Sequence, residues 1–119
     1  MALKRYVVEF GMGADLHGQD VTKAAKKAVR DAISRSCLCG LFEIVGIKGP
    51  EEMKIKLQIA CPFPDSLDVG EVRASVPLGE VELSVEKGGM VTRGLHYGPL
   101  GQGDNIVIAL ASLTVYVDV

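Results

Sequence analysis

The feature that most constrains the fold is a hydrophobic pattern with a period of two, which recurs in separate stretches of the chain. Residues 53–61 alternate between apolar side chains and the polar side chains of Lys54, Lys56 and Gln58. Residues 80–86 alternate in the same way. Alternation places one face of a strand against a core and the other in water, which is typical of antiparallel sheets. The chain is therefore expected to build a half-buried β-sheet.

Only one stretch carries a long helical period. Asp20 is expected to cap a helix over residues 21–36, because a short side chain with an oxygen acceptor precedes an alanine-rich run. Lysine and arginine side chains occupy the wet face of this helix. The apolar stripe at helical spacing consists of Val21, Ala25, Ala28, Val29, Ala32 and Ile33. One long helix among several strands predicts an α+β fold.

The remaining elements complete a ferredoxin-like order. We expect a strand over 3–11, a short strand over 42–47 and a second helix over 65–76 capped by Asp68. A final strand covers 105–119. The order β-α-β-β-α-β-β is that of a ferredoxin-like fold with an extra C-terminal strand, and right-handed crossovers would place both helices on one face of a mostly antiparallel sheet.

Length and composition limit the class of protein. A chain of 119 residues is the usual size of one domain, so residues 1–119 are expected to form a single α+β domain. The net charge of -2 gives no reason to expect nucleic acid or a membrane surface as partner. The chain has no apolar run of about 20 residues and no signal-peptide pattern, so we expect a cytoplasmic protein.

The last strand also predicts self-association. Residues 106–111 are apolar on both faces of the expected strand, which indicates that the sheet face opposite the helices is buried too. A second copy of the chain is the simplest cover for that face. We therefore expect a homo-oligomer, and trimers are a familiar solution for such sheets.

Cysteine adds little to this picture. Cys37 and Cys39 form a C-x-C pair, and Cys61 stands alone. An odd number in a reducing compartment does not indicate a disulfide framework, and C-x-C is not the C-x-x-C spacing of zinc ribbons. We interpret all three as small buried hydrophobic residues.

The segment that indicates chemistry is the glycine-rich run G-x-G-x-D-x-H-G, which lies between the first strand and the helix. Gly11, Gly13 and Gly18 allow close approach to a ligand, and a helix N-terminus attracts anions. A phosphate site fits poorly, because Asp15 and Asp20 would repel a phosphate unless a cation bridges them. The run also matches neither G-x-G-x-x-G nor the P-loop motif.

Asp15 and His17 suggest that cation. Side chains two residues apart in extended chain point to the same side, so both can bind one metal ion. A divalent ion, with Zn²⁺ first among them, accepts this combination of nitrogen and oxygen ligands. His96 is the candidate third ligand, and Asp20 and Glu9 are the alternatives.

These residues lead to a first hypothesis, a metal-dependent enzyme of hydrolase or lyase type that acts on a small polar metabolite. Glu9 or Asp20 would be the catalytic base, and Lys23 or Arg93 would hold an anionic group of the substrate. Two alternatives stay open. One is a non-catalytic homo-oligomeric module that binds a small molecule through the backbone amides of the glycine loop. The other is a structural loop in which Asp15 closes a turn and Asp20 caps the helix.

The run from Gly11 to Gly18, together with the following alanine-rich helix and the apolar last strand, resembles a family of conserved hypothetical proteins of bacteria and plants. Its signature is G-x-G-x-D-x-H-G, and the resemblance covers essentially the whole chain. The resemblance implies a shared site at this loop and supplies no reaction.

The D-x-H of Asp15 and His17 is also similar to the metal motif of methylerythritol cyclodiphosphate synthase. That resemblance implies a divalent metal held between subunits of a ferredoxin-like trimer. The third metal ligand of that enzyme is a histidine in a different context, which His96 does not match. The idea of a metal at a subunit boundary is carried over, and the activity is not.

Overall fold

The sheet is built around its last strand. The computed structural model describes residues 2–77 and 79–119. The strands follow the order β1-β5-β2-β3, with β4 also paired to β5. The strands are β1 (Leu3–Asp15), β2 (Lys54–Cys61), β3 (Glu80–Lys87), β4 (Met90–Arg93) and β5 (Asn105–Asp118). All pairings with β5 are antiparallel and β2 pairs with β3 in parallel, so the predicted α+β class with a mostly antiparallel sheet is confirmed.

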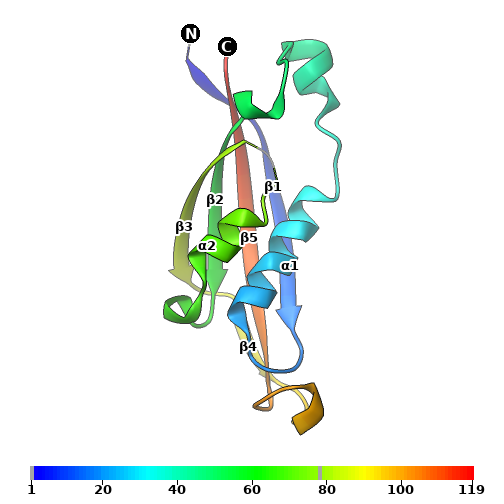
Figure 1. Ribbon diagram of the computed structural model, residues 1–119, viewed down its shortest axis with the longest axis vertical. Coiled ribbons are helices and arrows are strands. Elements are labelled where there is room, and N and C mark those ends of the chain that lie inside the picture. The colour runs from blue at the N-terminus through cyan, green and yellow to red at the C-terminus, as the bar shows by residue number, and fades with distance from the viewer. Residues whose placement is uncertain (1, 78) are drawn as a thin grey trace.

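Both α-helices lie across one face of the sheet, and the two ends of the chain meet at one end of the molecule (Figure 1). Helix α1 (Val21–Ile33) packs on β1 and β5, and helix α2 (Val69–Ala74) lies beside it. The core fills the space between these helices and the alternate residues of the strands, for example Leu57 and Leu113, which face each other across β2 and β5.

Aspartate caps begin both helices, as predicted. Asp20 Oδ1 accepts hydrogen bonds from the backbone N–H groups of Thr22 and Lys23 at 3.0 and 3.1 Å. Asp68 caps α2 through the N–H of Glu71 at 3.0 Å. The hydroxyl of Thr22 accepts the N–H of Asp68 at 2.9 Å, so the starts of the two helices are tied together.

Helix α1 rests directly on the backbone of β1. A Cβ atom at Gly11 would lie 2.5 Å from the backbone nitrogen of Ala32, and one at Gly13 would lie 2.6 Å from Cβ of Lys27 and would also collide with the backbone of Ala24 and Ala28. The alanine stripe of α1 presents the smallest side chains to this contact, and it is fully buried. Gly11 and Gly13 therefore serve the packing of helix on strand.

One predicted strand is wrong. Residues 42–47 form no strand, since Leu41–Val45 is a π-helical turn that ends at Gly46 in the left-handed conformation with φ 85°. Leu41 and Ile47 point into the core while Phe42 and Ile44 are exposed, so the run lacks the alternation of a half-buried strand. A short apolar run does not by itself distinguish strand from helix. The observed order is β-α-β-α-β-β-β, which differs from the predicted ferredoxin-like order.

Several boundaries also differ. Strand β1 continues to Asp15, because its residues through that position pair with β5. Helix α1 ends at Ile33 and not at Ser36. The predicted helix over 65–76 divides into a 3₁₀ turn at Pro64–Ser66 and the shorter α2.

Asp31 fastens the outer edge of β1 to α1. Its carboxylate accepts the backbone N–H of Met12 at 2.9 Å and pairs with Arg35 at 2.7 Å. The Met12 hydrogen bond, and after it Arg35, lowers the pKa of the Asp31 carboxyl from its usual range.

The sheet face opposite the helices divides into an apolar half and a charged half. The apolar half lies on β1, β5 and β4, where Phe10 is 66% exposed, Met12 56%, Met90 58% and Leu110 47%. Lysines of β2 and glutamates of β3 form adjacent columns on the other half. None of the helices in residues 2–77 and 79–119 has the length and apolar character needed to cross a membrane.

Candidate functional site

The carboxylate of Asp15 closes the turn that follows β1. Asp15 is buried, and its Oδ2 accepts the backbone N–H of Asp20 at 2.8 Å. Between them, Gly18 and Gln19 adopt the left-handed conformation, with φ of 104° and 54°. Asp15 thus stabilises a tight turn that ends at the helix cap.

A second loop lies against this turn. The side chain of Gln19 accepts the backbone N–H of Asn105 at 3.0 Å. A Cβ atom at Gly101 would lie 2.7 Å from the backbone nitrogen of Gly18, so the two loops touch through their glycines. The turn after β1 and the loop before β5 therefore converge, and backbone packing fills their contact.

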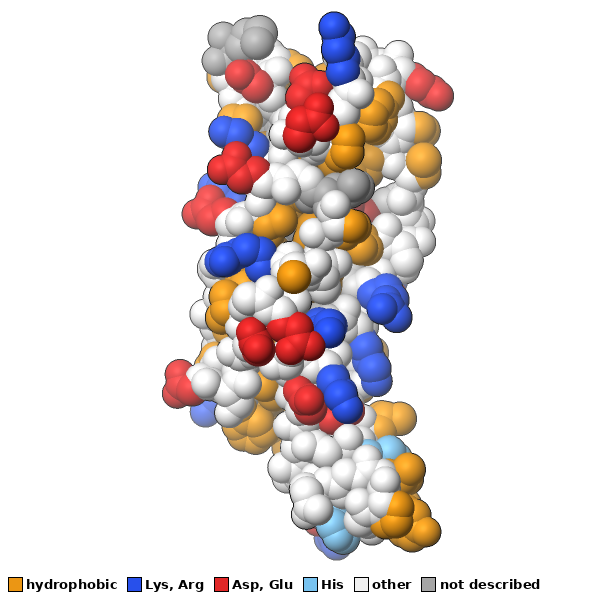
Figure 2. Space-filling view, in the orientation of Figure 1, with side chains coloured by type: hydrophobic (Ala, Val, Ile, Leu, Met, Phe, Trp, Pro, Cys, Tyr) orange, Lys and Arg blue, Asp and Glu red, His pale blue; other side chains and the backbone are white. Residues whose placement is uncertain are grey.

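The two histidines lie at the end of the molecule formed by these loops (Figure 2). His96 Nδ1 is 3.2 Å from the backbone oxygen of Gly103. His17 Nδ1 is buried and has no hydrogen-bond partner among the described residues. In the part of the chain that the structure describes, no three His, Cys, Asp or Glu side chains gather closely enough to hold a metal ion. The metal set Asp15, His17 and His96 stays a prediction.

The other predicted site residues are dispersed. Glu9 precedes Asp15 by six positions on β1, which corresponds to about 20 Å along a strand. Lys23 is exposed on the first turn of α1. Arg93 is also exposed, and its Nε lies 3.8 Å from Asp104 Oδ2. Glu9 is therefore not placed to act as a base at the Asp15 turn, and Arg93 is directed to Asp104.

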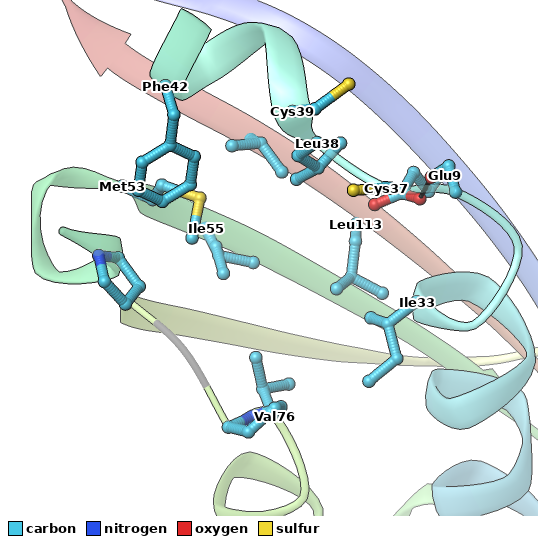
Figure 3. A pocket seen from close by; sticks show the side chains of 14 residues that line it. Glu9, Ile33, Cys37, Leu38, Cys39, Phe42, Met53, Ile55, Val76 and Leu113 are labelled. Atoms are coloured by element: carbon cyan, nitrogen blue, oxygen red, sulfur yellow. Dashed lines mark hydrogen bonds between the residues drawn. The ribbon is translucent and has the colours of Figure 1, made fainter. Parts of the chain in front are cut away.

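A cavity of about 490 Å³ lies near the other end of the helix face (Figure 3). Its floor is the sheet, and its walls come from the end of α1, the segment 36–42 and the residues that follow α2. Apolar side chains dominate the lining. Its residues are Glu9, Ile33, Ser36, Cys37, Leu38, Cys39, Phe42, Pro50, Met53, Ile55, Val76, Pro77, Leu113 and Val115.

The wall over this cavity is held by local structure. The backbone N–H of Leu41 donates to the oxygen of Leu38 at 3.1 Å, and the N–H of Ile47 donates to the oxygen of Leu41 at 3.0 Å. Leu41 itself is fully buried and anchors the segment to the core. A Cβ atom at Gly40 would collide with the hydroxyl of Tyr6, so the segment lies close against β1. These contacts keep residues 36–42 above the sheet and leave the cavity beneath them.

Glu9 provides the polar end of the cavity. The hydroxyl of Ser36 donates to Glu9 Oε2 at 2.5 Å, and Cys37 lines the same cavity (Figure 3). Among the described lining residues Glu9 is the only charged one. No lysine or arginine within the described ranges forms an ion pair with it.

The cysteines divide into two kinds. Cys61 is buried, and burial raises the pKa of its thiol. Cys37 and Cys39 are exposed at the cavity wall, so the prediction that all three are small buried hydrophobic residues is wrong for these two. The turn at Leu41–Val45 carries this segment across the surface instead of inserting it into the sheet.

The sequence offered one signal for this cavity. Residues 37–42 read Cys-Leu-Cys-Gly-Leu-Phe, an apolar run without helical or strand periodicity between two regular elements. In the structure, Leu38 and Leu41 of this run pack on the core, while its other apolar side chains stay exposed at the cavity wall. Its partners on β2 and β5 are distant in sequence, so their identity follows only from the fold.

Comparisons with known proteins agree with this fold. The family model for conserved hypothetical proteins (Lin0512_fam) matches residues 5–115. A crystal structure of an FtsZ-like protein of unknown function from Nostoc punctiforme has a TM-score of 0.89 and 42% sequence identity, and the alignment covers 100% of this chain and 99% of that one. The search of curated proteins gave no match.

Proposed function

This chain belongs to the Lin0512_fam family of conserved hypothetical proteins, and from that premise we propose that it is a non-catalytic module that binds a small molecule in the apolar cavity. The observation that carries this proposal is the cavity of about 490 Å³ beneath residues 36–42. Sites for small molecules commonly measure about 300–1,000 Å³ and combine an apolar lining with few polar groups. The cavity has both properties.

The hydrogen bonds at the glycine-rich turn support placing the ligand away from it. Asp15 accepts the N–H of Asp20, and Asp20 caps α1, so both carboxylates already have structural partners. Gly11 and Gly13 face the helix and have no space beside them for a ligand. These two carboxylates and two glycines therefore each have a structural role, which supports a ligand site elsewhere.

A divalent-metal hydrolase or lyase is the competing proposal. The unpartnered Nδ1 of His17 is the observation that favours it. Zinc content per chain, measured on protein purified without chelator, separates the two proposals. Stoichiometric zinc that is lost in His17→Ala would support the enzyme, and its persistence in that variant would exclude His17 as a ligand.

The binding proposal is tested with 1-octanol, a neutral apolar probe. Each buried methylene contributes about 0.8 kcal/mol, so the alkyl chain supplies most of the affinity. Isothermal titration calorimetry should give saturable binding of one molecule per chain. Ile33→Trp, which fills the cavity from the end of α1, should weaken binding roughly tenfold, equivalent to about 1.4 kcal/mol.

The matched control is Val91→Trp, which adds the same side chain on β4, outside the cavity lining. It should bind 1-octanol as the wild type does. The absence of saturable binding to wild-type protein would refute the proposed function. Equal weakening by both tryptophan variants would refute its location.

We also propose that the module is homo-oligomeric and that the apolar half of the open sheet face forms the contact. Phe10, Met12, Met90 and Leu110 are exposed there together, and monomeric proteins rarely expose large contiguous apolar patches. Sedimentation velocity should show a species larger than the monomer. A trimer is the oligomer that we expect from the sequence. Phe10→Glu should shift it to monomer, and a wild-type protein that is monomeric at every concentration would contradict this contact.

A further inference from the structure

We propose that the natural ligand of the cavity is an apolar amine whose ammonium group binds Glu9. This inference rests on the proposed function and names the chemical class of the ligand. It starts from the juxtaposition of one carboxylate with an otherwise uncharged cavity wall in the described residues.

The charge of Glu9 has no protein counter-charge within the described residues. The ion pairs in those residues join Lys26 to Glu71, Arg35 to Asp31 and Arg93 to Asp104, and none includes Glu9. A carboxylate beside apolar walls attracts a cation more strongly than one in bulk water, because the effective dielectric constant is lower there. A cationic ligand would supply the counter-charge, and an anionic ligand would be repelled.

The hydrogen bond to Ser36 leaves one carboxylate oxygen for the ligand. The Ser36 hydroxyl donates to Oε2, and Oε1 accepts no hydrogen bond from a side chain in the described part of the protein. An ionised carboxylate has only acceptor sites, so the group that binds it must be a donor. An ammonium group supplies both the donor and the positive charge, and such charge-assisted bonds are roughly twice as strong as neutral ones.

The sheet provides the place for the apolar body of the ligand. Glu9 pairs with Leu113 across β1 and β5, and Leu113 is one of the floor residues. Ile55 on β2 continues this floor beside Val115. From β1 to β2 the floor spans two strand spacings, about 10 Å. An alkyl or aromatic group attached to the amine would lie along these side chains, with Phe42 above it (Figure 3).

The test compares three probes of equal chain length, octylammonium, 1-octanol and octanoate, by calorimetry at neutral pH and low salt. The wild type should bind octylammonium roughly tenfold more tightly than 1-octanol, and octanoate most weakly. Added salt should reduce the preference for the amine, because mobile ions screen a partly exposed charge pair. Glu9→Gln keeps the size and an acceptor oxygen, and it should make the affinities for octylammonium and 1-octanol nearly equal.

Glu82→Gln is the matched control. It removes the same charge from β3 on the opposite sheet face, outside the lining of this cavity, and should leave the preference unchanged. Equal binding of all three probes to the wild type would overturn the proposal of an amine ligand. It would leave the proposed binding module standing. A preference that persists in Glu9→Gln would also overturn the proposal of an amine ligand. If none of the probes binds, the proposed function itself fails.

Discussion

Replacing Gly13 with alanine tests the interpretation that the glycines of β1 serve helix packing. Its Cβ atom would lie 2.6 Å from Cβ of Lys27 and would collide with the backbone of Ala24 and Ala28. Backbone atoms of a helix cannot rotate away as a flexible side chain can. The variant must therefore push α1 away from the sheet.

The expected cost follows from two opposing effects. Overpacking a close contact costs typically about 1–3 kcal/mol. Replacing glycine in a strand removes a conformational entropy loss of about 0.5–1 kcal/mol. The φ of Gly13 is not positive, so conformational strain adds nothing. The steric effect is larger, and we expect a net loss of about 1–2 kcal/mol in the free energy of unfolding.

Urea denaturation followed by circular dichroism measures this loss. With a slope of about 2 kcal/mol per molar, the midpoint should fall by roughly 0.5–1 M. Gly70→Ala is the control, because its Cβ would meet only Asp68 Oδ1 at 3.6 Å, an ordinary contact. That variant lies in α2 and should be neutral or more stable than the wild type.

An unchanged or raised midpoint in Gly13→Ala would refute the packing interpretation. A ligand-binding glycine would give that result together with a loss of binding. Equal destabilisation by Gly13→Ala and Gly70→Ala would also contradict the reasoning, since only position 13 lacks space for a Cβ atom.

The remaining predictions concern the caps, acid stability and thiols. Asp20→Ala should destabilise the protein by about 1 kcal/mol in urea denaturation, because α1 loses its N-cap; an unchanged midpoint would contradict this. The Met12 hydrogen bond and Arg35 depress the pKa of Asp31, so its contribution to stability is present above the ordinary value of 3.8 and is lost as the pH falls through the lower folded value. Asp31→Asn should therefore lose less stability than the wild type below pH 3.8 in acid titrations followed by circular dichroism, and identical acid profiles would refute this. Mass spectrometry after iodoacetamide treatment should find the two exposed cysteines labelled and Cys61 protected until the protein is unfolded, because Cys61 is buried and its thiol pKa is raised; labelling of Cys61 at the same rate would contradict its burial.

The sequence predicted those parts of the fold in which local pattern and burial agree. The alternation in residues 53–61, the apolar last strand and the caps Asp20 and Asp68 specify β2, β5 and the starts of both helices. The strand predicted for residues 42–47 is wrong because their apolar side chains point to different sides of a turn. No local rule distinguishes such a turn from a short strand. The extension of β1 to Asp15 depends on its pairing with β5, which lies far along the chain.

The site was harder to predict because one residue type supports two interpretations. The glycines at positions 11 and 13 allow close approach either of a bound ligand or of a helix backbone. Only the position of α1 decides between these two interpretations. Asp15 and His17 have the spacing of metal ligands, yet the Asp15 carboxylate is directed to the N–H of Asp20. The sequence suggests Glu9 as a base at the glycine loop, whereas in the structure Glu9 lines the apolar cavity. The cavity joins residues from β1, β2, β5 and the segment 36–42, so it exists only after folding.

The most direct test of the binding module is a heteronuclear NMR titration of ¹⁵N-labelled protein with 1-octanol. The account predicts amide shift changes at the cavity, in residues 33–42 and around Met53 and Val76, that saturate together. The turn 15–20 and the loop 96–105 should stay unchanged. Shift changes confined to that turn and loop, or none at saturating probe, would contradict the proposed site.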